Sequence, residues 1–419
     1  MSPTPPLTPS APDPVRDWAE SGVIALTGRA DGPPVIPPGR AATVARAMSS
    51  WIADVSALGG RQHLDIDGAR LLAERAAFTG RPRHGNISVG GSCRLLPTAD
   101  GWAAVSCARP DDPTLIGALI SDAVDEGNPW PAVADWLHTH TGAELTERAE
   151  LLGVAAGPVS PANTPPSVPA PLHPRPVDGL LVVDFSALWA GPLCAHLLGL
   201  AGARVVKVET PDRPDGARRG DPDFYHLLHG GHESVVLDPT TTEGRRALAA
   251  LVDAADIVLE ASRPRALTRF GLDADAAVAR GATWVSITAA GRSSDRIGFG
   301  DDLAAAAGLV AHDSDGTPLF VGDALADPLT GITAAALAMS APADGSGRLW
   351  DLSMSDIVAS TLTDQPVPQP FRRDGPWVVD ASSGVVPIAE PRPRTPAGRV
   401  AASGEDTAAV LASLRIAAP

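Results

Sequence analysis

The chain has 419 residues, with 33 Lys or Arg against 49 Asp or Glu, so its formal net charge is −16. This balance argues against a nucleic-acid partner, because neutralising phosphates requires clustered Lys and Arg. No apolar run reaches the roughly 18 residues of a membrane span, and the N-terminus lacks the apolar segment of a secretory signal. We therefore expect a cytoplasmic protein without a membrane partner.

Proline-rich stretches divide the chain into predicted domains. Residues 1–14 are predicted to be disordered, and residues 157–176 have the composition of an interdomain linker. The pieces between these stretches are a small α+β domain over 15–156 and a larger domain over 177–365, followed by a C-terminal tail segment over 366–419.

The first of these domains has mixed patterns. Residues 69–78 are compatible with a helix, and residues 92–96 and 102–107 surround a turn-like PTADG, which predicts a hairpin. Two amphipathic stretches, 131–138 and 143–152, predict helices. A small α+β domain follows from these patterns.

The second domain alternates strand and helix patterns. Short apolar runs bounded by turn residues predict five buried strands, at 180–185, 204–209, 234–238, 256–260 and 283–288. Helical stretches such as LCAHLLGLAGA and EGRRALAALVDA lie between strands. Such alternation predicts an α/β fold with a doubly wound, mainly parallel, Rossmann-like sheet, whose ligands bind beyond the carboxyl ends of its strands. The first βα loop, FSALWAGP, lacks the GxGxxG of a nicotinamide site.

One internal repeat is present. Residues 21–39 read SGVIALTGRADGPPVIPPG, and residues 307–322 read AGLVAHDSDGTPLFVG. Both contain Gly, two apolar residues and Ala, then Asp-Gly-x-Pro and a closing Gly. The second copy continues to Asp327, whereas the first has no acid at the matching place, around residues 40–44.

Four segments follow one another in the second domain: DGLLVVDFSALWAGPLCAHLLGLAGARVVKVE, SVVLDPTTTEGRRALAALVDAADIVLEASRPRALTRFGLD, FGDDLAAAAGLV and VGDALADPLTGITAA. In order and spacing they resemble the class III CoA-transferases, the CaiB/BaiF family. The N-terminal stretch GGSCRLLPTADGWAAVSCA resembles the small domain of that family, which normally follows the nucleotide-fold half. The chain therefore looks like the back of one copy joined to the front of another.

The resemblance implies two catalytic acids. Asp327 matches the family's nucleophilic aspartate, whose carboxylate attacks an acyl thioester and passes through an enzyme-bound thioester. Asp302 matches a second acid that acts in proton transfer in related racemases, although neighbouring Asp301 leaves that choice open. From the residues alone, Asp327 is equally compatible with a turn before Pro328, and Asp302 with a helix N-cap. Gly331 is a candidate for exposing backbone N–H groups to a developing oxyanion.

The resemblance also implies contacts with CoA. The matching positions are Leu188, Trp189, Ala190, Leu237, Ala261, Ser262, Arg263 and Arg269. Trp189 is compatible with stacking on adenine or with packing against the small domain, and Arg263 and Arg269 with phosphate pairing or with a solvated surface.

Several positions depart from the family pattern. His232-Glu233, Thr210 and Thr240 stand where basic residues are common, and Lys207 is the only lysine of the chain. The arginines at 213, 218 and 219 are candidates to compensate, and Gly90-Gly91 is a remnant of the glycine-rich lid found in formyl-CoA transferases.

CoA transfer between an acyl-CoA and a free carboxylate is the function that the resemblance favours. It implies acyl-CoA and a carboxylic acid as substrates, no tightly bound cofactor, no metal and a homodimer. Racemisation of 2-methylacyl-CoA is an alternative, but the loop AAGRSSDRIGFGD lacks the histidine of the racemases. A non-catalytic partner subunit is the third hypothesis, favoured by the missing basic residues.

Overall fold

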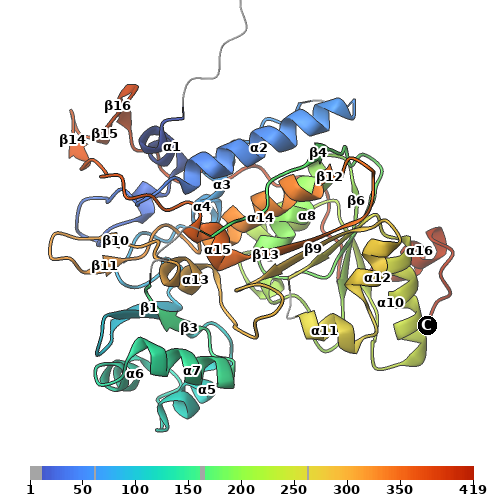
Figure 1. The fold of residues 1–419 in the computed structure, drawn as a ribbon, viewed down its shortest axis with the longest axis horizontal. Coiled ribbons are helices and arrows are strands. Elements are labelled where there is room, and N and C mark those ends of the chain that lie inside the picture. Colours follow the sequence, from blue (N-terminus) through green and yellow to red (C-terminus); the bar gives the residue numbers. More distant parts are fainter. Residues whose placement is uncertain (1–11, 61–62, 161–165, 262–263) are drawn as a thin grey trace, which may run out of the picture.

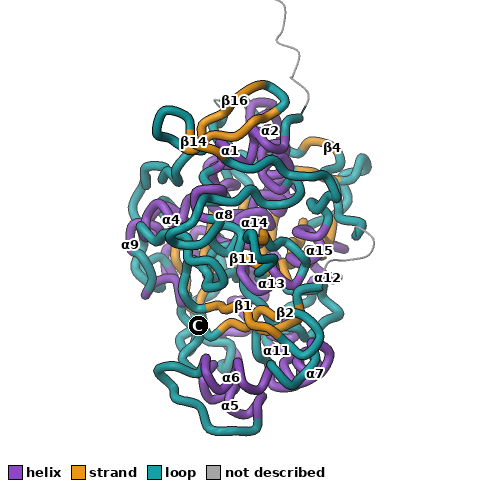
Figure 2. The backbone as a smooth tube through the Cα atoms, turned by 90° about the vertical axis from the view of Figure 1, so that its left-hand side faces the viewer, coloured by secondary structure: helices purple, strands orange, loops and turns teal. Residues whose placement is uncertain are grey.

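The computed structural model describes residues 12–60, 63–160, 166–261 and 264–419 (Figures 1 and 2). The predicted disordered segment 1–14 lies largely outside these residues, and so do Ser262 and Arg263. In the described ranges, no helix combines the length and the apolar character that a membrane crossing requires.

Six parallel strands form the central sheet. In sheet order they are β13 (Arg348–Ser353), β9 (Thr283–Thr288), β8 (Ile257–Glu260), β5 (Leu181–Asp184), β6 (Arg204–Glu209) and β7 (Glu233–Val236). Crossover helices connect them, which confirms the predicted α/β fold with a mainly parallel, Rossmann-like sheet.

Alternate residues of each strand point to opposite faces of the sheet. Val183 packs under the cluster formed by α10 (Thr242–Ala254), α12 (Ala274–Ala279) and α16 (Thr407–Ser413), at the right of Figure 1. Val182 packs in the cluster on the other face, which includes α8 (Ala190–Leu200), α14 (Ala326–Ala338) and α15 (Met354–Ala359). Burial on both faces explains why most residues of these strands are apolar.

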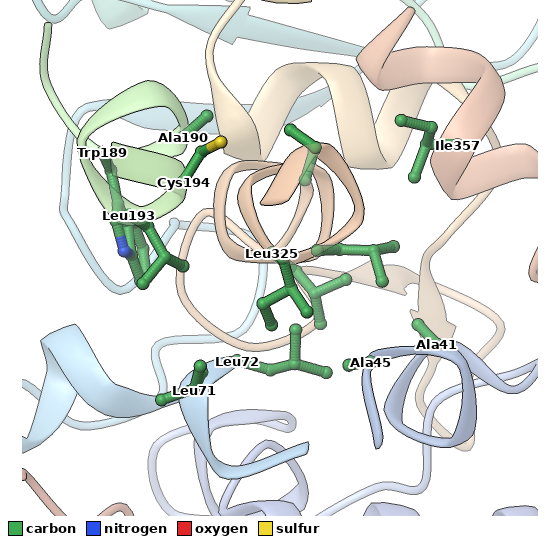
Figure 3. Close-up of a cluster of buried hydrophobic side chains, with 14 of the residues drawn as sticks. Ala41, Ala45, Leu71, Leu72, Trp189, Ala190, Leu193, Cys194, Leu325 and Ile357 are labelled. Carbon is green, nitrogen blue, oxygen red and sulfur yellow. The ribbon is translucent and has the colours of Figure 1, made fainter. Parts of the chain in front are cut away.

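Helix α14 lies at the centre of the larger cluster (Figure 3). On one side it packs against α8, and the two helices approach closely because Gly331 has no side chain: a Cβ there would lie 2.6 Å from the Ala190 carbonyl oxygen. On the other side lie Ala41 of α2 (Ala41–Leu58) and Leu71 of α3 (Gly68–Leu71). Gly331 therefore allows the close packing of these two helices.

The N-terminal residues contribute to two different cores. Those from α1 (Pro14–Ser21) to α4 (Glu74–Thr79) share the large cluster with the sheet and its helices. The second core is formed by an antiparallel sheet of β1 (Cys93–Pro97), β2 (Trp102–Ser106) and β3 (Ala156–Pro158), covered by α5 (Asp112–Ile120), α6 (Trp130–Leu137) and α7 (Gly142–Leu152). This unit is at the bottom of Figures 1 and 2, and its β1–β2 pairing confirms the predicted hairpin. The cores thus divide residues 15–156 between the two halves of the molecule.

The tail after residue 366 runs back across the molecule. Its strands β14 (Phe371–Arg372), β15 (Trp377–Ala381) and β16 (Gly384–Pro387) form a small sheet beside α1. Arg394 then donates from Nε to Glu74 Oε1 at 2.7 Å, and α16 packs beside β7. The other short elements are η1 (Ile24–Leu26), β4 (His173–Pro174), η2 (Gly216–Arg219), α9 (Pro222–His229), α11 (Pro264–Arg269), α13 (Gly300–Ala306), β10 (Ala311–His312), β11 (Pro318–Leu319) and β12 (Ser340–Ala341).

The two copies of the sequence repeat lie side by side. The Gly322 amide donates to Thr27 Oγ1 at 3.1 Å, and Arg29 Nε donates to Asp313 Oδ2 at 2.6 Å. Helix α2 follows the first copy as α14 follows the second, and these helices pack against each other. The repeat therefore forms a contact between its own two copies within one chain.

Candidate active site

Four aspartates gather where the N-termini of α13 and α14 meet. Asp301 and Asp302 occupy the first turn of α13, Asp327 occupies the first turn of α14, and Asp323 lies in the loop just before α14. Asp327 is the one that is partly exposed, whereas the other three are buried. A Cβ at Gly300 would lie 2.3 Å from Asp327 Oδ2, so a glycine is required where the two helices converge.

Arg75 of α4 enters this acidic group from the N-terminal part of the chain. Its Nε donates to Asp323 Oδ2 at 2.8 Å, and its Nη2 pairs with Asp323 Oδ1. The guanidinium lies 4.7 Å from the ring centroid of Trp189 and also attracts the charges of Asp301 and Asp327. A bidentate pair of this kind fixes both partners in orientation as well as in charge.

Burial raises the pKa values of three of these carboxyl groups. The pKa of Asp301 rises to about 7, through burial and the neighbouring Asp323 charge, against the opposing effect of Arg75. The pKa of Asp302 rises to about 6 through burial. For Asp327, burial raises the pKa to about 6, while Arg75 and a hydrogen bond from the Gly300 amide act to lower it. Near neutral pH these carboxyl groups are therefore partly protonated as a set, and Asp327 is mostly ionised.

Asp301→Asn is expected to stabilise the protein above neutral pH and to have no such effect below pH 4. The folded pKa of about 7 exceeds the ordinary value of 3.8, so the proton that stabilises the folded state at low pH is lost as pH rises through 7. An amide avoids that loss, and still accepts the Ala324 N–H that lies 2.8 Å from Oδ1. Thermal unfolding at pH 8 should show a gain of roughly 2–5 °C. A gain that is equal at pH 4 and pH 8 would contradict this linkage.

Asp302 is a capping and cross-linking residue as well as an acid. Its Oδ1 accepts the Phe299 amide at 2.9 Å, which satisfies a free N–H at the start of α13, and the Ser106 hydroxyl at 2.8 Å. Ser106 belongs to β2, so this contact joins the small sheet to the larger half of the molecule. The buried Oδ2 of Asp302 has no hydrogen-bond partner among the described residues.

The loop after β5 brings together three of the positions predicted to contact CoA. Leu188 is 45% exposed and has a positive φ of 69°, a strained conformation stabilised by its amide donating to Asp215 Oδ1 at 3.0 Å. Trp189 lies in the buried cluster beside Leu193 (Figure 3) and is 2% exposed. Its ring packs edge-on against Phe224, so it is not presented to a nucleotide at the surface. Ala190 is buried under α14. Leu188 is therefore the accessible member of this trio.

The other predicted contact positions are dispersed. Ala261 is half-buried and adjoins the β5–α8 loop, since a Cβ at Gly191 would lie 3.4 Å from Ala261 Cβ. Leu237 is 1% exposed and packs in the cluster under α10. Arg269 is exposed at the end of α11, while Ser262 and Arg263 lie outside the described residues. The structure thus places Ala261 beside Gly191 at the start of α8, and Leu237 away from the surface.

The only lysine is a buried structural residue. Lys207 is 2% exposed, and its Nζ lies 2.8 Å from Asp215 Oδ2 and donates to the Ser186 carbonyl oxygen at 3.0 Å. Nearby His232 is also buried, and burial, with Lys207 adding to it, lowers its pKa to about 3. Neither side chain supplies a charge to a ligand at the surface.

Sequence reasoning missed Arg75 and Asp323. Asp323 lies four residues before Asp327, but Arg75 lies 248 residues from Asp323, on a six-residue helix without any motif. Only the fold brings α4 to the start of α14. In the described ranges, no group of three or more His, Cys, Asp or Glu residues is arranged to hold a metal ion.

Part of the chain is similar in sequence to known proteins. Residues 177–382 match the model of CoA-transferase family III. A succinate–glutarate CoA-transferase from Agrobacterium fabrum is 29% identical over 219 residues, covering 46% of this chain and 55% of that protein. A succinyl-CoA–D-citramalate CoA-transferase from Chloroflexus aurantiacus is 30% identical, covering 45% and 52%. The chain thus spans about half the length of these curated relatives.

Among solved structures, a CaiB/BaiF family protein from Brucella suis is 27% identical, covering 51% of this chain and 65% of that one, with a TM-score of 0.43. The family match covers every strand of the parallel sheet, the first residues of α13 and α14, and Asp327. Over residues 177–382, about half of its length, the chain is therefore similar to CoA-transferase family III.

Proposed function

We propose that the protein is a CoA-transferase that moves CoA from an acyl-CoA to a free carboxylic acid through an aspartyl-CoA intermediate on Asp327. The observation that carries this proposal is the state of Asp327 within the family-matched segment: a partly exposed carboxylate with a pKa of about 6 at the start of a buried helix. A carboxylate in this state is ionised at neutral pH and accessible enough to act as a nucleophile.

The reaction divides one transfer into balanced steps. The Asp327 carboxylate attacks the thioester carbonyl, and the carbon–sulfur bond breaks to give a mixed anhydride and a CoA thiolate. The thiolate attacks the aspartyl carbonyl, which releases the donor acid and leaves CoA as a thioester on Asp327. The acceptor carboxylate then attacks this thioester, and the same two steps in reverse release the new acyl-CoA and the free aspartate.

Arginines near the exposed loop are the candidates to bind CoA phosphates. A Cβ at Gly216 would lie 3.3 Å from Leu188 Cδ2, so η2 adjoins the accessible residue of the first loop. Arg218 is committed to Glu209, with its Nη2 2.5 Å from Oε2, whereas Arg213 and Arg219 are exposed. Exposed guanidinium groups suit bidentate phosphate binding. In this proposal, Arg213 and Arg219 therefore bind the phosphates that lysines bind in the CaiB/BaiF family.

The proposal is tested by trapping the intermediate. The protein is incubated with succinyl-CoA, chosen because the two relatives act on related acids, and then with hydroxylamine, which converts an aspartyl anhydride or thioester to a hydroxamate. Peptide mass spectrometry should find the hydroxamate on Asp327. Modification on another residue, or exchange of an α-deuterium of a 2-methylacyl-CoA without modification, would contradict transfer through Asp327.

The same proposal includes a homodimer that acts in the cytoplasm without a tightly bound cofactor. Light scattering coupled to size-exclusion chromatography measures the mass directly, and a monomer at all concentrations would remove the dimer from the proposal.

A further inference from the structure

Arg75 has more neighbours than a simple ion pair requires. It pairs in a bidentate manner with Asp323, which is 1% exposed at its side chain, while the side chain of Arg75 is 27% exposed. The Trp189 ring lies under the guanidinium, and a Cβ at Gly90 would be 3.5 Å from Nη2. The Asp323 carboxylate, the Trp189 ring and the backbone at Gly90 therefore surround the Arg75 guanidinium.

The charges around Asp327 come from each element that packs there. Asp302 acts on it from α13, Asp323 from the preceding loop and Arg75 from α4, while Asp301 interacts with Asp323 and Arg75. Arg296 acts on Asp302, and the Cys93 thiol nearby stays neutral because burial raises its pKa. Arg75 is the cation whose charge acts on three of the four acids, and an acidic cluster without it would hold its protons to higher pH.

We propose that Arg75 is a positioning residue for the transfer reaction, which fixes the loop before α14 through its bidentate pair with Asp323 and brings its positive charge to the acidic group that includes Asp327. This inference rests on the proposed function for its role in catalysis. It adds a residue from outside the family-matched segment 177–382 to the site.

The test measures the titration of Asp327 directly. Carboxyl carbons of aspartate are labelled with ¹³C, and the Asp327 resonance is assigned by its loss in Asp327→Asn. In Arg75→Gln the titration midpoint should rise by about one pH unit or more, because an attracting charge is removed. In Arg75→Lys, which keeps the charge, the midpoint should stay within about half a unit of the wild type.

Activity gives a second measurement. The acid limb of the kcat/KM profile for CoA transfer should move upward with the NMR midpoint in Arg75→Gln, which gives about a fivefold loss near pH 6, about a tenfold loss near pH 5 and little loss at pH 9. Arg204→Gln is the matched control, because Arg204 also binds a carboxylate in a bidentate manner, Glu233 at 2.6 and 3.0 Å, at the opposite end of β6. Its profile should coincide with that of the wild type.

The outcomes separate the two proposals. An unchanged Asp327 midpoint in Arg75→Gln, or a uniform loss of rate at every pH, would overturn the role of Arg75. A shifted midpoint in a protein that forms no hydroxamate would support Arg75 and contradict the proposed function. If Arg75→Gln does not fold, a midpoint in Arg75→Lys that moves by more than one unit would overturn the inference.

Discussion

Asp327→Asn should abolish CoA transfer, with a loss of kcat of about 10⁴-fold or more, because an amide cannot form the acyl anhydride. The variant should fold, since the amide keeps an acceptor oxygen for the Gly300 amide and removes a carboxyl group whose pKa is already raised by burial. Liquid chromatography of the acyl-CoA products measures the rate, and the hydroxylamine trap should give no hydroxamate.

Asp356→Asn is the matched control for this variant. Asp356 also lies in the first turn of a helix, α15, and is exposed outside the acidic group, so its replacement should leave the rate within about twofold. In the wild type, kcat/KM should fall as pH decreases through about 6, where Asp327 takes up its proton. Measurable turnover by Asp327→Asn would place the nucleophile elsewhere.

Lys207→Met should destabilise the protein by about 3–5 kcal/mol, because it leaves a buried carboxylate without its counter-charge. Lys207 and Asp215 are both almost fully buried, and their Nζ and Oδ2 atoms lie 2.8 Å apart. Lys207 also acts against the burial that raises the pKa of Asp184, so its loss affects two acids. Chemical denaturation followed by circular dichroism measures the difference in unfolding free energy.

The double variant Lys207→Met, Asp215→Asn should recover part of this loss. The asparagine removes the uncompensated charge and keeps the oxygen that accepts the Leu188 and Ala217 amides at 3.0 and 2.9 Å. The prediction would be contradicted if Lys207→Met lowered the unfolding free energy by less than about 1 kcal/mol, or if the double variant were less stable than Lys207→Met. Either result would show that the ion pair of Lys207 and Asp215 does not contribute the expected stability.

Local patterns were sufficient to predict the sheet. Val182 and Val183 both meet an apolar layer, so the strand that contains them is mostly apolar and stands out between turn residues. The β1–β2 hairpin was also predictable, because a polar turn joins two short apolar strands. Asp327 was predicted to be the nucleophile from the family resemblance, because nothing in the residues around it distinguishes it from an aspartate in an ordinary turn.

Long-range contacts set the limit of prediction. Arg75 binds Asp323 across 248 residues, and no local pattern marks such a pair. Trp189 left two interpretations open, and its burial against Phe224 and Arg75 is a property of the assembled core. The proline-rich stretches predicted a separate domain over residues 15–156. In the structure, α1–α4 instead belong to the core of the sheet, because apolar faces such as that of α2 are buried against α14.

The contact between the two repeat copies has a consequence for how the molecule responds to dilution. Thr27 meets Gly322, and Arg29 meets Asp313, within one polypeptide. Since the connecting chain fixes the effective concentration of one copy near the other, this contact keeps the same occupancy at nanomolar and millimolar protein. Helix α14 and the acid at its start are thus supported on the α2 side by a neighbour that cannot dissociate.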